Sequence, residues 1–313
     1  MTMDEPAFAA HIGDTYRIER RLGSGGGGIV YMARHMRMDR LVAIKEALRP
    51  DGCGYEARRH EAQALMRMKS MYLPQVYDFI IEGPRAYTVM EFIAGESFDK
   101  LLERGYTFTE AQISGWYLQL ALALATLHRH CVRHRDIKPS NVMLTPGGDI
   151  CLIDFGSAIV GDGDPGLLSR SPGYASPEQQ ELFDRIGVLF PVSDEPCRQS
   201  SAPREACRIN TVMGGCADTL VTAAAGMPLS RYIDWRLSDI YSLGATIFHL
   251  ATGRRLPEDA GDAAVDSILE LSGKSTTAGT PSRLTRIIAH SLRADPSDRY
   301  PSADELIKAL REV

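Results

Sequence analysis

Long apolar runs are missing from this sequence. No stretch of its 313 residues approaches the roughly 18 uninterrupted apolar residues of a membrane-spanning helix, and the most apolar window, residues 116–131, ends in basic residues. The first residues lack the basic and apolar regions of a signal peptide. We therefore expect a cytoplasmic chain, or the cytosolic domain of a longer protein, with no membrane segment in this chain.

Cysteine is scarce, with six residues in the sequence. Cys53, Cys131 and Cys151 are scattered among periodic segments, and we interpret them as small buried hydrophobes. The other three lie in one segment, at positions 197, 207 and 216, and no two have the CxxC spacing of a zinc site. This usage favours a reducing cytosolic setting over a metal or disulfide framework.

Basic residues are not in excess either. The net charge of −5 argues against a dedicated nucleic-acid surface, so no nucleic-acid partner is expected. A hydrophobic content of 44% and a charged content of 24% are those of a soluble globular protein. The length suits one large domain or two packed lobes.

Strand patterns are concentrated in residues 16–93, where apolar and polar residues alternate in several stretches. One helix is expected there, over residues 56–71. The residues near one face of that helix are Ala57, Ala64, Leu65 and Met68.

Helix patterns dominate the rest of the chain. Thr109 and Gln112 have capping-box spacing ahead of a largely buried helix that continues to residue 130. Ser302 and Glu305 form a second such pair at the start of the last helix. The apolar positions of that last helix are Leu306, Leu310 and Val313. We expect a small β-rich lobe followed by a larger helical lobe.

The stretch GSGGGGIVY, residues 23–31, places four consecutive glycines between two strand patterns. A flexible linker seldom lies inside a hairpin, and a dinucleotide fingerprint leads from a strand into a helix, whereas here a strand continues. The stretch fits G-x-G-x-x-G-x-V with Gly23, Gly25, Gly28 and Val30. Glycine lets backbone N–H groups approach phosphate oxygens. The match alone is a weak signal, because any glycine-rich run fits this pattern somewhere, and its place in a hairpin makes it stronger.

Lys45 lies inside the apolar strand LVAIKEAL. A lysine that faces a core is costly unless its ammonium is paired, and Glu61 on the expected helix can supply the carboxylate. From this strand alone, a snorkelling surface lysine is an equal alternative.

Two segments farther along carry more specific motifs. HRDIKPSNVML, residues 134–144, and LIDFGSA, residues 152–158, have the catalytic-loop and Asp-Phe-Gly patterns of phosphoryl transfer. Together with the glycine loop, Val-Ala-Ile-Lys, Ser-Pro-Glu and Asp-x-Tyr-Ser-Leu-Gly, they stand in one order along the chain. From about Tyr16 to its last residue the chain resembles the protein kinases, most closely the eukaryotic-like serine/threonine kinases of bacteria.

The resemblance implies an α+β, two-lobed fold. After an N-terminal extension at residues 1–15, residues 16–93 would form the small β-rich N-lobe, with one main helix, and the hinge. Residues 94–313 would form the larger, mainly helical C-lobe. An insertion at about 182–232 is unusual for the family.

The resemblance also implies an ATP-dependent serine/threonine protein kinase that takes part in bacterial signalling and uses Mg²⁺, with Mn²⁺ as the alternative cation. Lys45, fixed by Glu61, would hold the ATP α- and β-phosphates. Asn141 and Asp154 would hold the metal, since hard cations prefer oxygen ligands.

Asp136 would act as the general base on a Ser or Thr hydroxyl of a protein substrate. Lys138 would neutralise charge developing on the phosphoryl group, and lysine at this position resembles the serine/threonine-specific loop. The adenine would lie in an apolar slot, with hydrogen bonds from the hinge backbone beyond the gatekeeper Met90, and plain core packing is the alternative for the apolar members. The nucleotide-binding set is Leu22, Gly23, Gly25, Gly28, Val30, Ala43, Lys45, Met90, Glu91, Ile93 and Met143.

Other positions that match the family would be structural. His134 and Phe155 would stack with Leu65, Asp239 would hold the backbone of the catalytic loop, and Glu178 would form a buried ion pair with Arg299. Four further histidines lack metal-like spacing and are expected to be structural or solvated: His128, His130, His249 and His290.

Regulation is expected in the activation segment. Arg135 precedes Asp136, and kinases with this arginine are commonly activated when a loop phosphate neutralises it. Ser169 is the leading autophosphorylation candidate, with an unmodified loop serine as the alternative, and Ser171 is assigned a positioning role. Arg170 in place of glycine, and Ser-Pro-Glu in place of Ala-Pro-Glu, depart from the family pattern.

The insertion follows this segment. It adds roughly 40 residues, beyond ordinary loop lengths, and residues 182–190 could form a short amphipathic helix. We hypothesise that it contacts a protein substrate or regulator, or folds over the activation segment. An insertion without function is the alternative.

Two rival functions are a pseudokinase scaffold and a small-molecule phosphotransferase with a kinase-like fold. A pseudokinase usually lacks one of Lys45, Asp136, Asn141 or Asp154, and all four are present. The small-molecule enzymes lack an activation segment with the Ser-Pro-Glu anchor.

Overall fold

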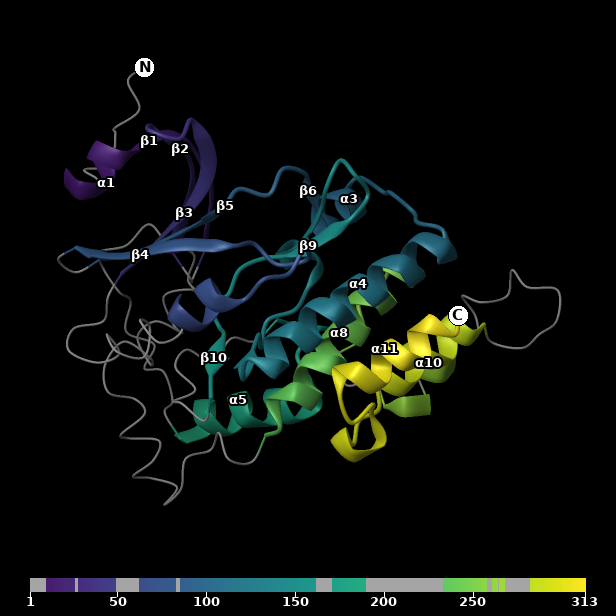
Figure 1. The fold of residues 1–313 in the computed structure, drawn as a ribbon. Coiled ribbons are helices and arrows are strands. Elements are labelled where there is room, and N and C mark those ends of the chain that lie inside the picture. The colour runs from purple at the N-terminus through teal and green to yellow at the C-terminus, as the bar shows by residue number, and fades with distance from the viewer. Residues whose placement is uncertain are drawn as a thin grey trace. The chain divides into compact units, whose positions relative to one another are not determined.

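The computed structural model describes residues 10–25, 28–48, 62–82, 85–161, 171–189, 233–257, 261–263, 265–267 and 282–313. They divide into two compact units (Figure 1). The N-terminal unit contains the described residues up to Arg67 together with Pro74–Ile93, and the C-terminal unit contains Met68–Leu73 and the described residues from Ala94 onward.

The N-terminal unit is built on a five-stranded antiparallel sheet with the strand order β1-β2-β3-β5-β4. Its strands are β1 (Tyr16–Gly25), β2 (Gly28–His35), β3 (Arg40–Leu48), β4 (Val76–Glu82) and β5 (Arg85–Glu91). The alternating patterns of the sequence therefore did indicate strands. The repeated glycines join β1 to β2, so the predicted hairpin is confirmed.

The strand register divides the side chains between two faces of the sheet, because residues directly opposite one another point the same way. One face carries a core in which Ile44, Tyr87 and Val89 pack with Ile12 of helix α1 (Ala10–Thr15). The segment set apart as an N-terminal extension thus contributes to this core. The other face carries Lys45 and the residues beside it.

The helix predicted over residues 56–71 is shorter at its C-terminal end than expected. Residues 62–67 are helical and residues 68–70 are not, while residues 56–61 lie outside the described part of the chain. Leu65 and Met68 are buried as expected, but Ala64 is only partly buried and Ala62 takes the buried position.

The C-terminal unit is mainly helical, which confirms the predicted helical lobe. Helix α4 packs against both α8 and α11, and α8 also packs against α10. The helices are α3 (Phe98–Glu103), α4 (Glu110–Arg129), α5 (Pro177–Leu189), α8 (Trp235–Thr252), α10 (Arg283–Ser291) and α11 (Ala303–Arg311). Short strands complete it: β6 (Glu96–Ser97), β7 (Val132–Arg133), β8 (Val142–Leu144), β9 (Ile150–Leu152) and β10 (Ile159–Val160), with the 3₁₀ turns η1 (Pro139–Asn141) and η3 (Pro296–Asp298).

Two helix starts were predicted from capping boxes, and the structure completes one of them. Thr109 accepts from the Gln112 backbone N–H and the Gln112 side chain accepts from the Thr109 N–H, which is a full box. Ser302 caps α11 by accepting from the Glu305 N–H, but the Glu305 carboxylate is bound by Lys308. Val313 is exposed, so its expected place on the apolar face is wrong.

Cys131 is also corrected by the structure. It follows the end of α4 with a positive φ of 57° and is exposed, whereas Cys151 on β9 is buried as predicted. A left-handed residue at a helix end stops the helix and turns its side chain out of the periodic pattern. Cys53 and the three clustered cysteines lie outside the described residues.

The short amphipathic helix predicted at the start of the insertion is not a separate element. Residues 182–189 continue α5, which begins at Pro177. Residues 190–232 lie outside the described part of the chain, so the proposed role of the insertion is untested.

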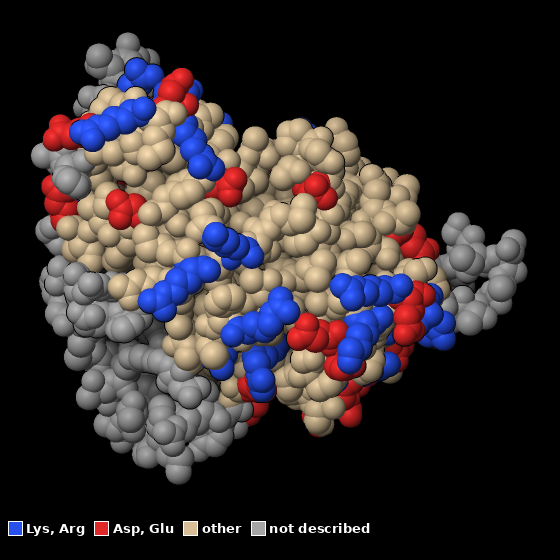
Figure 2. Space-filling model, viewed as in Figure 1, with Lys and Arg blue, Asp and Glu red and all other residues tan. Residues whose placement is uncertain are grey.

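Charges on the C-terminal unit are mixed. Figure 2 shows basic and acidic side chains side by side toward α10 and α11, where Lys308 pairs with Glu305 and Arg283 with Glu312. This mixture is typical of a solvated surface. Within the described ranges, no helix is both long and apolar enough to span a membrane.

Candidate active site

Asn141 and Asp154 are brought together by the hairpin of β8 and β9. Val142 pairs with Leu152 in antiparallel register, and one step beyond that pair the Ile153 N–H donates to the Asn141 carbonyl at 2.8 Å. Asn141 therefore lies immediately before β8, opposite Ile153, and Asp154 is the residue after Ile153. Asp154 has a positive φ of 65°, a backbone state that a non-glycine residue adopts only at a cost.

The catalytic loop is fastened to helix α8 by Asp239. This fully buried carboxylate accepts the His134 N–H at 2.9 Å and the Arg135 N–H at 2.7 Å, and His128 Nε2 lies 3.1 Å from it. A buried carboxylate is costly unless hydrogen bonds compensate it. Here the compensation comes from the loop backbone, including Arg135, whose φ is 63°. The helix thus holds the loop in a conformation that it would not keep alone.

Asp136 lies at the centre of a hydrogen-bonded cluster. Its Oδ1 accepts from Ser171 Oγ at 2.6 Å, and its Oδ2 lies 2.8 Å from Lys138 Nζ. Lys138 Nζ also donates to Ser171 Oγ at 2.9 Å, which closes a triangle. Ser171 and Lys138 together fix the direction of the Asp136 carboxylate, and Asp136 stays partly exposed.

The oxygen donors next to this cluster fit a hard divalent cation. Asn141 Nδ2 donates to the Asp136 carbonyl at 2.7 Å and to Asp136 Oδ2 at 3.2 Å, which orients the amide so that Oδ1 is the atom left for a cation. Asp154 Oδ1 accepts from the Gly156 N–H at 3.1 Å. Across the described residues no three acidic, histidine or cysteine side chains gather into a cation site. Mg²⁺ suits such a place, since it often takes one or two protein oxygens and completes its shell with water and phosphate.

Arg135 is buried and held by several groups. Its Nε donates to the Ser157 carbonyl at 2.6 Å, its guanidinium lies 5.1 Å from the centre of the Trp235 ring, and its carbonyl accepts from Gln179 Nε2. The aromatic ring stabilises the cation by a cation–π contact. Ser169 lies outside the described residues, so phosphorylation there remains a prediction.

The His134 and Phe155 rings lie 5.4 Å apart between centres and are tilted by 59° to one another, so these two residues are in contact. Their contact with Leu65 stays a prediction. His134 Nε2 is 3.2 Å from the Ile153 carbonyl, and His134 is fully buried. The contact joins the loop that carries Asp136 to the segment that carries Asp154. It is a packing role.

The contacts of Ser176 explain why a serine suits the first position of the Ser-Pro-Glu motif. The Ser176 side chain is fully buried, lies 2.8 Å from Ser238 Oγ on α8, and accepts from the Gln179 N–H at the start of α5. Glu178 binds Arg299 through two hydrogen bonds of 2.7 and 2.8 Å, which is the predicted ion pair.

In the N-terminal unit, the register places four of the predicted nucleotide-contacting residues on one sheet face. Lys45 pairs with Val30 on β2, and Ala43 pairs with Met90 on β5. Because i and i+2 share a face, these four side chains point to the same side, opposite the core under α1. Lys45 is partly buried, and Glu61 lies outside the described residues.

The glycines of the β1–β2 hairpin differ in how much space there is for a side chain. Gly28 has a φ of 119°, and a Cβ there would lie 2.0 Å from the Glu46 carbonyl of β3, so only glycine fits. A Cβ at Gly23 would meet nothing within 4 Å. Leu22 is exposed where the β1–β2 register shifts. The close approach of β2 to β3 is therefore enough to explain the glycine at position 28, whether or not a phosphate binds there.

One of the hinge backbone groups expected to be open to an adenine is already hydrogen-bonded within the protein. The Glu91 N–H already donates to the Gln75 carbonyl at 2.8 Å, so Glu91 has only its carbonyl to offer an adenine. Ile93 follows it in the same unit. Met143 lies on β8 of the C-terminal unit, where it pairs with Cys151.

One pair of residues beside the loop was missed by the sequence analysis. Tyr174 Oη lies 2.6 Å from His249 Nδ1 on α8. Burial raises the pKa of Tyr174 to about 12, and burial, then Arg255, lowers the pKa of His249. The Tyr174 hydroxyl therefore donates a hydrogen bond to the neutral His249 imidazole. A separation of 75 residues left no local signal for this pair.

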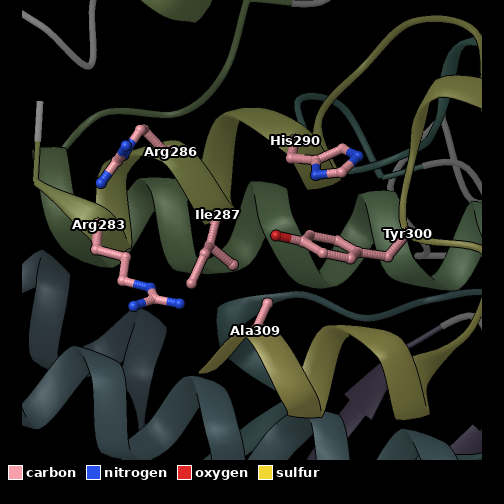
Figure 3. Close-up of a pocket in the computed structure, with 6 residues that line it drawn as sticks. All are labelled: Arg283, Arg286, Ile287, His290, Tyr300 and Ala309. Carbon is pink, nitrogen blue, oxygen red and sulfur yellow. The ribbon is translucent and has the colours of Figure 1, made fainter. Parts of the chain in front are cut away.

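A separate pocket lies between α10 and α11 (Figure 3). Arg283, Arg286 and His290 line it from α10, with Ala309 on α11, and the His290 ring stacks on Tyr300 with centres 4.1 Å apart. None of the predicted site residues belongs to it. His290 is exposed, so the prediction that the unassigned histidines are structural or solvated stays open between these two roles for this residue.

These features define a class of protein. A β-rich unit with a glycine hairpin and a strand lysine precedes a helical unit with an oriented aspartate and an adjacent asparagine–aspartate pair, which is the architecture of a phosphotransferase of the protein kinase type. A family model described as the protein kinase domain matches residues 16–181. The chain belongs to the protein kinase family, and the predicted two-lobed kinase fold is confirmed.

Relatives agree with this assignment. The chain is 30% identical to the serine/threonine-protein kinase PknA of Corynebacterium glutamicum, over 96% of this chain and 57% of the relative. It is 27% identical to PknL of Mycobacterium tuberculosis (96% and 65%) and 27% identical to PrkC of Bacillus subtilis (94% and 40%), both named serine/threonine-protein kinases. The resemblance to bacterial kinases of the eukaryotic type is therefore confirmed. The chain spans between 40% and 65% of the length of these relatives.

Proposed function

We propose that this chain is a serine/threonine protein kinase that transfers the ATP γ-phosphoryl group to Ser or Thr hydroxyls of protein substrates. The observation that carries the proposal is the cluster in which Ser171 and Lys138 fix the Asp136 carboxylate. The reaction depends mainly on positioning and charge neutralisation, and this cluster supplies a directed acceptor beside a cation.

Asp136 would accept the proton of the substrate hydroxyl as that oxygen bonds to the γ-phosphorus of ATP and the β,γ-bridging oxygen leaves with ADP. Ser171 donates to Oδ1 of this carboxylate and Asn141 to Oδ2. Lys138 places its ammonium where negative charge develops on the transferred group. Lys45, paired with Glu61, holds the α- and β-phosphates.

Asn141 and Asp154 would hold Mg²⁺, with Mn²⁺ as the alternative ion. When bound, the metal neutralises charge on the phosphate oxygens. Leu22, the glycine hairpin and Met90 would bind the nucleotide in the N-terminal unit, where the Glu91 carbonyl and the Ile93 backbone would hydrogen-bond the adenine. Met143 is the predicted adenine contact in the C-terminal unit.

The test is phosphate transfer with purified chain, Mg-ATP and a general protein substrate, with phosphoamino acid analysis of the product. Asp136→Asn should lower kcat by at least about 100-fold while nucleotide affinity stays unchanged. ATP binding without turnover in the unaltered chain would indicate a pseudokinase, and transfer only to small molecules would indicate the other rival.

Regulation and location complete the proposal. Ser169 is autophosphorylated, and the insertion at 182–232 contacts a substrate or regulator in the cytoplasm. Intact-mass spectrometry after incubation with ATP tests the first point, and active enzyme without phosphate on Ser169 would refute it. Deletion of residues 184–228 tests the second, and unchanged turnover of the physiological substrate would refute it.

A further inference from the structure

The loop that follows α8 lies directly against the segment that follows Ser171. A Cβ placed on Gly173 would lie 2.8 Å from the Leu256 carbonyl and 3.5 Å from Arg255 Cβ. Tyr174, the next residue, contacts His249 at 2.6 Å. The Cβ of Arg255 therefore lies beside Gly173, and the rest of the Arg255 side chain extends from that position.

This place is close to where a phosphoacceptor hydroxyl would bind. Ser171 Oγ donates to Asp136 Oδ1 at 2.6 Å, and Gly173 is two residues farther on. Consecutive Cα atoms are ~3.8 Å apart, so Gly173 lies within about 7.6 Å of Ser171. An extended substrate advances about 3.3 Å per residue. Side chains up to about three residues from the acceptor therefore come within reach of Arg255.

The loop that carries Arg255 has a fixed start. Gly253 ends α8 in the left-handed conformation with a φ of 68°, and Thr252 Oγ1 accepts from the Arg254 N–H at 3.1 Å. Arg255 itself is exposed. A charged group on a capped loop loses less freedom on binding than one on an unrestrained loop.

Among the described residues, Arg255 forms no ion pair with a carboxylate. It acts on the Tyr174 hydroxyl by charge and a hydrogen bond. The neighbouring His249 is neutral. Asp99 is the acidic residue that acts on Tyr174, but one of its oxygens, Oδ1, is buried and without a hydrogen-bond partner.

We propose that Arg255 is a specificity-determining residue, which makes this chain prefer substrates with an Asp or Glu side chain within three residues of the phosphoacceptor. The guanidinium donates charge-assisted hydrogen bonds to that carboxylate. The inference rests on the proposed kinase function and deepens it by naming a substrate class.

The experiment uses synthetic peptides with one serine, in which each of the three positions on either side carries Ala, Glu or Lys in turn. With the unaltered chain, Glu at one or more positions should raise kcat/KM about three- to tenfold over Ala, mainly through KM. Arg255→Glu should reverse the preference toward Lys, and Arg255→Lys should retain part of it. The matched control is Arg286→Glu on α10, an exposed arginine whose reversal makes the same change in net charge and should leave the preference unaltered.

Three outcomes overturn the proposal: no preference for Glu in the unaltered chain, the same preference in Arg255→Glu, or an equal shift in Arg286→Glu. If Arg255→Glu loses activity on the all-Ala peptide, Arg255→Gln replaces it and should abolish the preference while keeping that activity. Failure of the kinase function itself looks different, because no peptide or protein is then phosphorylated. Fluorescence anisotropy with labelled Glu and Lys peptides still reports the preference in that case.

Discussion

Replacing Glu178 with glutamine should destabilise the C-terminal unit, because the substitution leaves a buried guanidinium without its counter-charge. The Arg299 side chain is 0% exposed, and Glu178 accepts from both of its terminal nitrogens, at 2.7 and 2.8 Å. The remaining donor capacity of Arg299 goes to three backbone carbonyls, those of Arg293, Leu237 and Ala294. No solvent reaches the cation, so water cannot replace the carboxylate.

The magnitude follows from this geometry. Breaking a buried ion pair by removing one partner costs roughly 3–5 kcal/mol in free energy of unfolding. Glu178 is 16% exposed, which weakens its field slightly, so we expect about 3 kcal/mol. For a unit of this size such a loss lowers Tm by about 6–12 °C.

Tryptophan fluorescence during urea denaturation is the appropriate assay. The two tryptophans of the sequence, Trp116 on α4 and Trp235 on α8, both lie in this unit. The control is Glu96→Gln, which removes an ion pair of the same length, 2.7 Å, between side chains that are 35% and 52% exposed. That control should cost less than about 1 kcal/mol. If Glu178→Gln costs no more than Glu96→Gln, the argument from burial is wrong.

Three further predictions concern stability. Gly28→Ala should lower Tm in thermal unfolding followed by circular dichroism, because its Cβ would lie 2.0 Å from a backbone carbonyl, whereas Gly23→Ala should change the free energy of unfolding by less than about 1 kcal/mol; equal effects would contradict this. His249 and His290 both have pKa values lowered by burial, so the unfolded chain binds protons first as the pH falls. Their stabilising contribution should be complete above about pH 6.5 and decline below it, and urea midpoints that stay constant between about pH 7.5 and 5.5 would argue against it. Ser176→Ala should cost about 1 kcal/mol by removing the cap of α5, as measured by urea denaturation, and an unchanged midpoint would show that the hydroxyl is dispensable.

Local patterns predicted the elements well where they were long or carried a cap. The box at Thr109 marked the start of α4, alternation marked the strands on either side of the glycine stretch, and a turn signal marked the pair β4 and β5. Ends without such a signal were predicted less well. The helix before β4 ends at residue 67, and residues 68–73 belong to the C-terminal unit. Helix α5 continues past residue 182, since no helix-breaking residue lies at that point.

The errors share a physical cause. Cys131 was interpreted as a buried residue because it lies among periodic segments, but the chain turns through a left-handed residue at that point and exposes the thiol. Glu305 was assigned to a capping box, but Lys308 one turn later competes for its carboxylate. In both cases a local preference was correct in kind, and a neighbouring interaction decided the outcome.

The sequence by itself determined which chemical groups the chain has and in what order: the glycine hairpin, the strand lysine, and the aspartates and asparagine of two short motifs. It also determined the period of each element, because strands and helices repeat over two and 3.6 residues whatever surrounds them. Only the tertiary structure decided which groups meet. Ser171 reaches Asp136 across 35 residues of chain, and Asp239 reaches the His134 backbone across 105. Such contacts depend on how the helices pack, and no local pattern records that packing.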